Sequence, residues 1–412
     1  MKTLLLLITM LVSFNMYAQS YLVGHVSVNF KDSSRTTNGY TISGGVTMAG
    51  SGRTIGTEIF YPAVASGNSA AVANGQFPVV VFGHGFAMSY NSYSNVYDSL
   101  VKLGYIILLP RTEGGIFPSP SHSEFGDDLK LLAMQGLALN VNSLPNSTVS
   151  FVGKVKQAAA IGGHSMGAGA SFLAGANNTN ITCIFNFAVA TTNPSSITAA
   201  AFVTVPTLII SGQKDNVADT TVQNSHYSAT SATTKFHTII KDVTHCDFGT
   251  GTSSTCNFGQ ASCSNAGCNS VLFNRYMTYL VPFLGNLLKE VCTDGPLFMD
   301  SIISNSPNRV GTKITGRLAC VISAINQNNI EQVNYNVYPN PTNNMLTISF
   351  KPINTSPTII KLYDILGRLI LTDIETTAQL STIEKHIDLQ IIDNGIYFMT
   401  INEQYKLKII KN

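Results

Sequence analysis

The sequence IGGHSMGAGASFLAGA, at residues 161–176, points most directly to the fold. It contains the pattern G-x-S-x-G, with Ser165 between Gly163 and Gly167. An apolar run at residues 158–161 leads into the pattern and small residues follow it, which is typical of a strand that turns sharply into a helix. Glycines suit such a turn because side chains there would meet neighbouring backbone. The pattern therefore predicts a serine at a strained strand-to-helix turn, where a catalytic nucleophile can be placed.

Short β-rich runs alternate with helix-like segments around this turn. The runs stand at residues 54–62, 77–83, 105–110, 157–163, 183–190, 206–212 and 235–243, and the helix-like segments at 92–103, 125–139 and 269–291. Several runs are continuously apolar, as expected of strands covered on both faces. We expect the second helix to begin near Asp127 and Asp128, whose charges favour a helix N-terminus. The alternation predicts an α/β fold, a mostly parallel sheet with helices on both faces.

The nucleophile needs two partners later in the chain. A serine hydroxyl reacts poorly without a base, and the base needs an acid to orient it. In a fold of this kind both follow the serine in chain order, at the ends of later strands. Asp215 comes directly after the run at 206–212 and is the expected acid, with Asp219 as the alternative. His245 follows the run at 235–243 and is the expected base.

Three other histidines could be mistaken for the base. His226 lies in a predicted helix and His237 inside a predicted strand, so we expect both to be structural. His84 precedes the serine in the chain, and we expect it to position a loop.

The oxyanion that develops in acyl transfer needs two backbone N–H donors. One should come from Met166, directly after the nucleophile, and the other from Phe86 in the loop FGHGFAMSYNSY at residues 82–93. The side chains of Phe86 and Met166 would then lie beside the substrate. Tyr90 and Tyr93 either line the same cleft or pack at the start of the next helix.

These motifs carry a resemblance over residues 54–291. With GTEIFYP, VVVFGHGF, GYIILLP, GHSMGAGAS, LIISGQKD and VTHCDF, the segment resembles α/β-hydrolases of three kinds: cutinase-like polyester hydrolases, chlorophyllase-like enzymes and bacterial relatives of platelet-activating-factor acetylhydrolase. The resemblance implies carboxylic-ester hydrolysis without a cofactor, with Ser165, Asp215 and His245 as triad. Polyester hydrolases of this type usually carry a tryptophan near residues 190–193, and this chain has no tryptophan. The sequence therefore gives no support to polyester cleavage.

Composition and the N-terminus bear on partners and location. Charged residues make up 11% of the chain, against ~25% in typical soluble proteins, and no basic block appears. Nucleic-acid binding needs a clustered cationic face, so that class is excluded. Residues 1–19 contain Lys2, then a short apolar stretch and then a site of small residues, and this order predicts a signal peptide. No apolar stretch reaches the ~20 residues that span a membrane, so no transmembrane segment is expected.

Seven cysteines fit an exported protein. Six lie in the second half of the chain: Cys246, Cys256, Cys263, Cys268, Cys292 and Cys320. They lack the paired spacing of a zinc site, so we expect no metal and at least one disulfide. Spacing does not define the pairing, although Cys320 is one candidate partner for Cys292. Cys183 stands in an apolar run and is expected to be a free buried thiol.

The chain changes character after the last helix-like segment. Residues 293–334 lose the β/α alternation, and 324–334 are polar and linker-like. Residues 335–412 then predict a small all-β sandwich. The motifs VYPNPTNNMLTISF, IKLYDILGRLI, DNGIYFMTI and KLKIIKN resemble the sorting domain of the type IX secretion system. This implies contact with that machinery and passage through the periplasm to the cell surface or medium. A carbohydrate-binding sandwich is the alternative.

The expected organisation is a signal peptide at 1–19, an α/β-hydrolase domain at 20–323, a linker at 324–334 and a sorting domain at 335–412. Three functions remain open: a secreted hydrolase of carboxylic esters, including lipase-, cutinase- or polyester-type substrates; a serine peptidase of the same fold; and a non-catalytic secreted binding protein. An intact triad in chain order favours catalysis, and the sequence contains no large cap domain that would hold a peptide.

Overall fold

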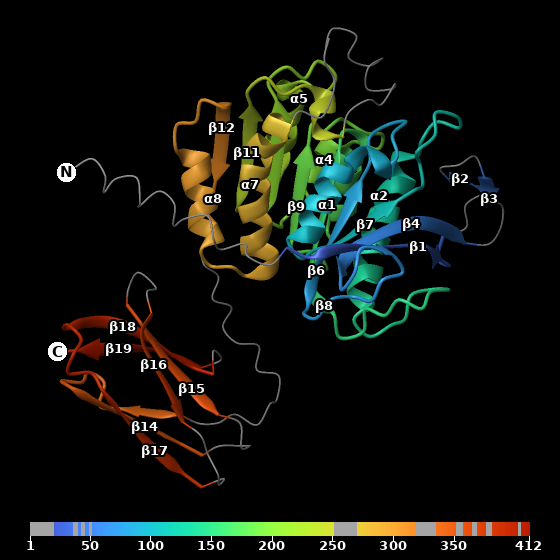
Figure 1. Ribbon diagram of the computed structural model, residues 1–412. Helices are drawn as coiled ribbons and strands as arrows, with labels where there is room; N and C mark the ends of the chain where they lie inside the picture. Colours follow the sequence, from blue (N-terminus) through green and yellow to red (C-terminus); the bar gives the residue numbers. More distant parts are fainter. Residues whose placement is uncertain are drawn as a thin grey trace, which may run out of the picture. The chain divides into compact units, whose positions relative to one another are not determined.

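The chain divides into two compact units, residues 1–322 and 323–412, each with its own hydrophobic core (Figure 1). The computed structural model describes residues 20–35, 40–42, 46–48, 52–250, 270–318, 335–351, 357–364, 369–375, 381–402 and 405–412. The predicted signal peptide, the predicted linker and the cysteines at 256, 263, 268 and 320 lie outside these residues.

A ten-stranded sheet forms the centre of the first unit, in the order β12-β11-β10-β9-β8-β6-β7-β4-β1-β5. Its strands are β1 (Leu22–Asp32), β4 (Arg53–Ala63), β5 (Gly67–Asn68), β6 (Phe77–Gly83), β7 (Ile106–Pro110), β8 (Val155–His164), β9 (Cys183–Phe187), β10 (Thr207–Gly212), β11 (Lys235–Ile240) and β12 (Arg309–Thr315). The six strands from β7 to β11 are parallel, while β4, β1 and β12 add antiparallel pairs at the two sides. A short ribbon of β2 (Tyr40–Ile42) and β3 (Val46–Met48) stands apart from this sheet.

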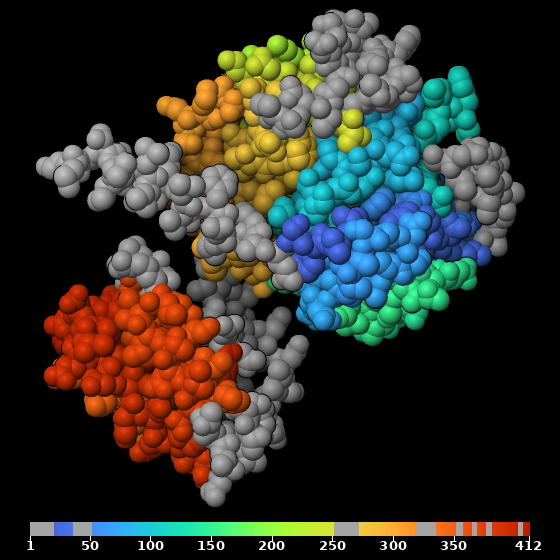
Figure 2. All heavy atoms as spheres, in the orientation of Figure 1, coloured from blue at the N-terminus to red at the C-terminus, as the bar shows by residue number. Residues whose placement is uncertain are grey.

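Helices cover both faces of the sheet. They are α1 (Ser94–Lys102), α2 (His122–Ala138), α3 (Met166–Gly175), α4 (Ser196–Ala200), α5 (Thr220–Ala229), α7 (Ser270–Lys289) and α8 (Asp294–Ile303), with the 3₁₀ turns η1 (Tyr90–Tyr93) and η2 (His245–Phe248). The β6 side chains alternate between the two resulting cores: Val79 and Val81 join one, and Val80 and Phe82 the other. Figure 2 shows all heavy atoms in the orientation of Figure 1, with the gold α7 and the cyan α1 on the side facing the viewer. The α/β-hydrolase fold is thus present.

Two expectations differ from the structure. Helix α2 begins at His122, and its N-cap is Ser121, whose hydroxyl accepts from the Glu124 N–H at 3.3 Å. The prediction that Asp127 and Asp128 start this helix was wrong, because Asp128 is fully buried and neutralises arginines instead. The region after α7 was expected to lack β/α structure, yet it contains α8 and β12. Strand β12 pairs antiparallel with β11 and closes that side of the sheet.

The second unit consists of two antiparallel sheets around a small core. One has the order β13-β14-β17 and the other β16-β15-β18-β19. Their strands are β13 (Asn336–Tyr338), β14 (Met345–Phe350), β15 (Thr358–Tyr363), β16 (Leu369–Glu375), β17 (Ile383–Asp388), β18 (Gly395–Ile401) and β19 (Tyr405–Lys411). Alternate β18 side chains are buried, including Tyr397, Met399 and Ile401. The predicted all-β domain is confirmed.

Two further features concern the helices and the cysteines. None of the helices in the described ranges is long and apolar enough to cross a membrane. Cys246 and Cys292 each take part in a disulfide bond. Cys183 is a buried free thiol, and burial raises its pKa. The pairing of the bonded cysteines lies outside the described residues and stays a prediction.

Candidate active site

Ser165 occupies the turn between β8 and α3, at the carboxyl end of a central strand. Its backbone has φ 55° and ψ −118°, a left-handed conformation that is strained for a residue with a side chain. Three hydrogen bonds hold this conformation. The Ser165 N–H donates to the Phe187 carbonyl at 3.0 Å, and the Ser165 carbonyl accepts from Gly169 at 3.0 Å and from Ala190 at 3.2 Å. The surrounding structure thus fixes the serine in a strained position, as nucleophile turns require.

The glycines of the turn allow three segments to approach one another. A Cβ atom at Gly163 would lie 2.4 Å from the carbonyl carbon of Gly167. One at Gly169 would lie 2.5 Å from the carbonyl oxygen of Ala190. These distances are far below van der Waals contact and involve backbone atoms, which cannot move aside easily. The sequence pattern therefore reflects close backbone packing around Ser165.

Asp215 and His245 follow the neighbouring strands β10 and β11 and lie in contact. The Nδ1 atom of His245 is 2.9 Å from Oδ2 of Asp215, and both side chains are buried. The other carboxylate oxygen, Oδ1, accepts the N–H groups of Val217 at 2.9 Å and Ala218 at 2.8 Å. Because a carboxylate can only accept here, Nδ1 of His245 carries the hydrogen. In the neutral tautomer, Nε2 is then the acceptor nitrogen.

A capping box that sequence reasoning missed holds the turn that begins at His245. The Asp247 carboxylate accepts from the Thr244 N–H at 2.7 Å and from the Thr244 hydroxyl at 2.8 Å. The buried Asp247 side chain therefore fixes the backbone that carries the imidazole. The signal was present as T-x-x-D, but it was interpreted only as part of a family motif.

The alternative partners have structural contacts. Asp219 is the N-cap of α5 and accepts from the N–H groups of Thr221 and Val222. His226 and His237 are buried: the first contacts the Ser196 hydroxyl at 2.8 Å, and the second the Ser211 hydroxyl at 2.7 Å.

The two candidate oxyanion donors come from segments that touch. Within the described residues no acceptor is in hydrogen-bonding position to the N–H of Phe86 or of Met166. Met166 is the first residue of α3, so its N–H lies at the positive end of a helix. The Met166 side chain is buried, whereas the Phe86 ring is 44% exposed. Backbone N–H groups without an acceptor are the kind of donors that can hold an oxyanion.

The tyrosines of the Phe86 loop differ in their surroundings. Tyr90 is partly buried, and its ring centroid lies 6.2 Å from that of Phe60. Tyr93 is fully buried and does not line a surface cleft; its hydroxyl accepts the Gly85 N–H at 2.8 Å. Of the two expected roles, Tyr93 therefore has the packing role, and Tyr90 remains a candidate for substrate contact.

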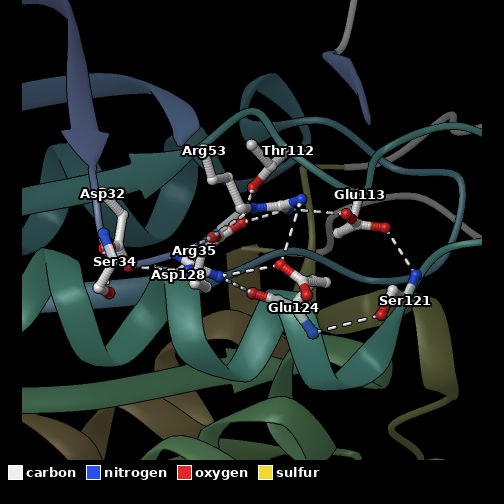
Figure 3. Close-up of polar contacts among 9 residues, drawn as sticks. All are labelled: Asp32, Ser34, Arg35, Arg53, Thr112, Glu113, Ser121, Glu124 and Asp128. Atoms are coloured by element: carbon white, nitrogen blue, oxygen red, sulfur yellow. Dashed lines mark hydrogen bonds and ion pairs between the residues drawn. The ribbon is translucent and has the colours of Figure 1, made fainter. Parts of the chain in front are cut away.

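Beside this site lies a buried ionic cluster that sequence reasoning did not find (Figure 3). Arg53, which is 1% exposed, donates to both oxygens of the fully buried Asp128, at 2.7 and 2.6 Å, and to Glu113 at 2.7 Å. Arg35 adds a second guanidinium on Asp128 at 2.7 Å. Burial alone would lower the pKa of Arg53, but its hydrogen bond and ion pair with Asp128 raise it above the ordinary value.

The cluster anchors the loop between β7 and α2 at both ends. The Thr112 hydroxyl donates to Asp128 at 2.6 Å, and Glu113 accepts from the Ser121 N–H at 2.6 Å. The loop in turn contacts the segment that carries Phe86, since Nε2 of His84 lies 2.9 Å from the Thr112 carbonyl oxygen. His84 is buried, and burial lowers its pKa. Its surroundings agree with the expected loop-positioning role.

No group of three or more His, Cys, Asp or Glu side chains is placed to hold a metal ion in the described part of the chain. At this edge of the sheet stand a strained serine, the His245–Asp215 pair and two N–H groups without an acceptor among the described residues, a set of groups that would suit acyl transfer. Such an arrangement at the carboxyl edge of this sheet is typical of an α/β hydrolase.

Comparison with known families gives two matches. Residues 68–213 match the family model for chlorophyllase, and residues 336–412 match that of the secretion system C-terminal sorting domain. The first match includes Ser165 and ends before Asp215. No curated protein matches the chain. The chain is a secreted hydrolase with a chlorophyllase-like segment, and its sorting domain directs it through the type IX system to the cell surface or medium.

Proposed function

We propose that this secreted hydrolase cleaves carboxylic esters through a triad of Ser165, His245 and Asp215. Two observations carry the proposal. The strained Ser165 turn follows β8 and the His245–Asp215 pair follows β10 and β11, at the same edge of the sheet. His164, which precedes Ser165, has its Nε2 atom 2.8 Å from the His245 carbonyl oxygen. Serine nucleophiles of this kind act by forming an acyl-enzyme.

The proposed reaction has two halves. The Ser165 oxygen attacks the ester carbonyl, and its proton passes to Nε2 of His245. The carbonyl oxygen becomes an oxyanion that accepts from the Phe86 and Met166 N–H groups. The tetrahedral intermediate collapses, the proton moves from His245 to the leaving alcohol, and Ser165 keeps the acyl group. Water then repeats the sequence, releasing the acid and restoring the serine.

Exposed side chains on the loops around the proposed site support the hypothesis that its substrates are apolar. Four large apolar side chains are exposed on loops at the carboxyl edge of the parallel strands. They are Phe86 (44% exposed), Ile116 (53%), Phe117 (88%) and Val217 (48%). Exposed large apolar side chains at one edge of a sheet are candidates for substrate contact. The proposed substrates therefore carry a sizeable apolar acyl or alcohol group, as lipase- and cutinase-type esters do. Polyester cleavage has no separate support.

One assay tests the proposal. The purified protein is incubated with p-nitrophenyl acetate, p-nitrophenyl octanoate and a set of peptide p-nitroanilides, and the rate of hydrolysis of each is measured. We expect hydrolysis of both esters, with a higher kcat/KM for the octanoate, and no cleavage of the anilides. Cleavage of anilides above esters would favour the serine peptidase. Inertness toward every substrate would favour the non-catalytic binding protein.

A further inference from the structure

A buried tyrosine links the oxyanion loop to the nucleophile turn. The Tyr93 hydroxyl lies 2.8 Å from the Gly85 nitrogen and 2.9 Å from Nδ1 of His164. On the far side of the same imidazole, Nε2 of His164 lies 2.8 Å from the carbonyl oxygen of His245. Tyr93 and His164 are both 0% exposed. Gly85 immediately precedes Phe86, and His164 immediately precedes Ser165, so this chain of contacts joins three parts of the proposed site.

The direction of each hydrogen bond follows from what each atom can do. The carbonyl oxygen of His245 can only accept, so Nε2 of His164 must carry the hydrogen. A neutral imidazole then has an unprotonated Nδ1, which accepts from the Tyr93 hydroxyl. The Tyr93 oxygen still has lone pairs for the Gly85 N–H. Met88 Sδ lies 3.2 Å from the same oxygen, but sulfur is a weaker acceptor than the imidazole nitrogen.

The same hydrogen bonds bear on the protonation of two neighbouring imidazoles. The rings of His164 and His245 have centroids only 4.7 Å apart. Burial lowers the pKa of His164 well below its ordinary value, and the charge of a protonated His245 lowers it further. His164 therefore stays neutral while its neighbour gains and loses a proton. Its fixed tautomer keeps the bond to the His245 backbone throughout the reaction.

We propose that Tyr93 is a positioning residue for the oxyanion hole. Through Gly85 it sets the orientation of the peptide segment that presents the Phe86 N–H. Through His164 it ties that segment to the backbone of His245. This inference rests on the proposed ester hydrolysis, and it assigns to Tyr93 no contact with the substrate.

Loss of the phenol hydroxyl would leave two buried groups without partners. In Tyr93→Phe the ring still fills its place, but the Gly85 N–H loses its acceptor and Nδ1 of His164 loses its donor. Unpaired buried polar groups raise the free energy of the folded protein. The loop therefore relaxes to arrangements in which the Gly85 N–H finds another acceptor. The Phe86 N–H then moves with it. An oxyanion donor acts mainly in the transition state, so the loss should appear in kcat rather than in KM.

The test compares Tyr93→Phe with Tyr97→Phe, using p-nitrophenyl butyrate and the full chain. Tyr97 is a matched control because it is buried in the next helix and its ring stacks on Phe60 at 4.0 Å. We expect Tyr93→Phe to lower kcat about 10-fold with KM within twofold, which is less than the ~10²–10³ that loss of a donor costs. Tyr97→Phe should keep the wild-type kcat. The acid limb of the pH profile should stay in place, because the His245–Asp215 pair is untouched.

A kcat within twofold of wild type for Tyr93→Phe would overturn the inference, as would an equal loss in Tyr97→Phe or a loss confined to KM. If Tyr93→Phe fails to fold, His164→Gln is measured instead. Its amide nitrogen can replace Nε2 toward the His245 carbonyl, but it has no acceptor at the position of Nδ1, because its Cγ is a methylene group. The same fall in kcat is therefore expected, and an unchanged kcat contradicts the role. Failure of the ester-hydrolase proposal is distinct, because the wild-type protein would then hydrolyse no ester or Ser165→Ala would keep its activity.

Discussion

A Cβ atom at Gly167 would lie 2.2 Å from the carbonyl oxygen of Gly83. The first turn of α3 therefore packs directly on the end of β6, with no side chain between them. Gly83 leads into the loop with Phe86, and Gly167 follows Met166, so this contact sets the spacing between the two candidate oxyanion donors. Backbone spacing of this kind cannot be adjusted by a side-chain rotation.

Gly167→Ala should therefore damage activity. The added methyl group forces β6 and α3 apart and widens the gap between the two N–H donors, for which loss of one costs about 10²–10³ in kcat. Kinetics with a p-nitrophenyl ester, with circular dichroism as a check of folding, would measure the effect. Gly153→Ala is the control, because nothing lies within 4 Å of a Cβ there, although its φ of 72° adds some strain. A folded Gly167→Ala protein with wild-type kcat would contradict the close-contact argument.

Ser165→Ala should abolish ester hydrolysis while the protein still folds. Alanine fits the space of the serine, and the backbone bonds to Phe187, Gly169 and Ala190 are kept. Removal of a triad nucleophile typically lowers kcat by about 10⁴-fold or more. The rate with p-nitrophenyl butyrate, together with the thermal midpoint, gives the answer. A variant that keeps a tenth of the wild-type rate would show that another residue is the nucleophile.

Asp215 should be the acid that orients His245, and Asp219 should not. Asp215→Asn places an amide opposite Nδ1 of His245 and favours the wrong tautomer, which typically lowers kcat by about 10⁴. Asp219→Asn keeps an N-cap residue on α5 and should leave kcat unchanged. The two variants are compared at saturating ester. A larger loss for Asp219→Asn would reverse the assignment.

The sequence predicted the parts of this structure that have local signatures. The run at 77–83 coincides with β6, and Ser165 stands at a strand-to-helix turn, because continuous apolar runs and G-x-S-x-G are local patterns. Strand β12 was missed because most of its side chains are exposed and its apolar residues do not alternate regularly with polar ones. Asp128 was misinterpreted because its partner Arg53 is 75 residues away, and no local pattern records such a pairing. The Tyr93–His164 contact spans 71 residues and was missed for the same reason.

Buried histidines should make the fold sensitive to acid. Burial lowers the pKa of His237 to about 4 from 6.5, and it also lowers the pKa values of His84, His164 and His226. Between pH 6.5 and 4 the unfolded chain binds a proton at His237 that the folded chain does not. The free energy of unfolding therefore falls as the pH falls through that window, by up to about 1.4 kcal/mol per pH unit for one histidine.

His237→Gln tests this sign. Its amide can still contact the Ser211 hydroxyl, but it does not titrate. Urea unfolding at pH 7 and at pH 5 should show a smaller acid-induced loss in the variant than in the wild type. His25 works in the opposite direction, because its hydrogen bond to Glu58 raises its pKa. An equal loss in the variant and the wild type would mean that His237 is protonated in the folded protein.

The C-terminal unit should be dispensable for catalysis and required for export. Its core is formed by its own residues, among them Leu346, Ile360 and Met399, and the first unit has separate cores. A domain with its own core can be removed without loss of its neighbour's fold. A chain that ends near Gln327 and begins after the predicted signal peptide should therefore hydrolyse soluble esters about as fast as the longer form. Comparison of kcat/KM for the two proteins measures this.

Export is tested with the predicted signal peptide kept. The sorting domain matched at 336–412 is addressed to the type IX machinery, so its removal should leave the enzyme in the periplasm of a host with that system. Immunoblots of periplasm, cell surface and medium would follow the two forms, and Ser165→Ala on the full chain controls for any effect of activity on transport. If the truncated protein still reached the medium but no longer bound an insoluble ester, the module would be a binding domain. Its two antiparallel sheets would then serve attachment to a substrate.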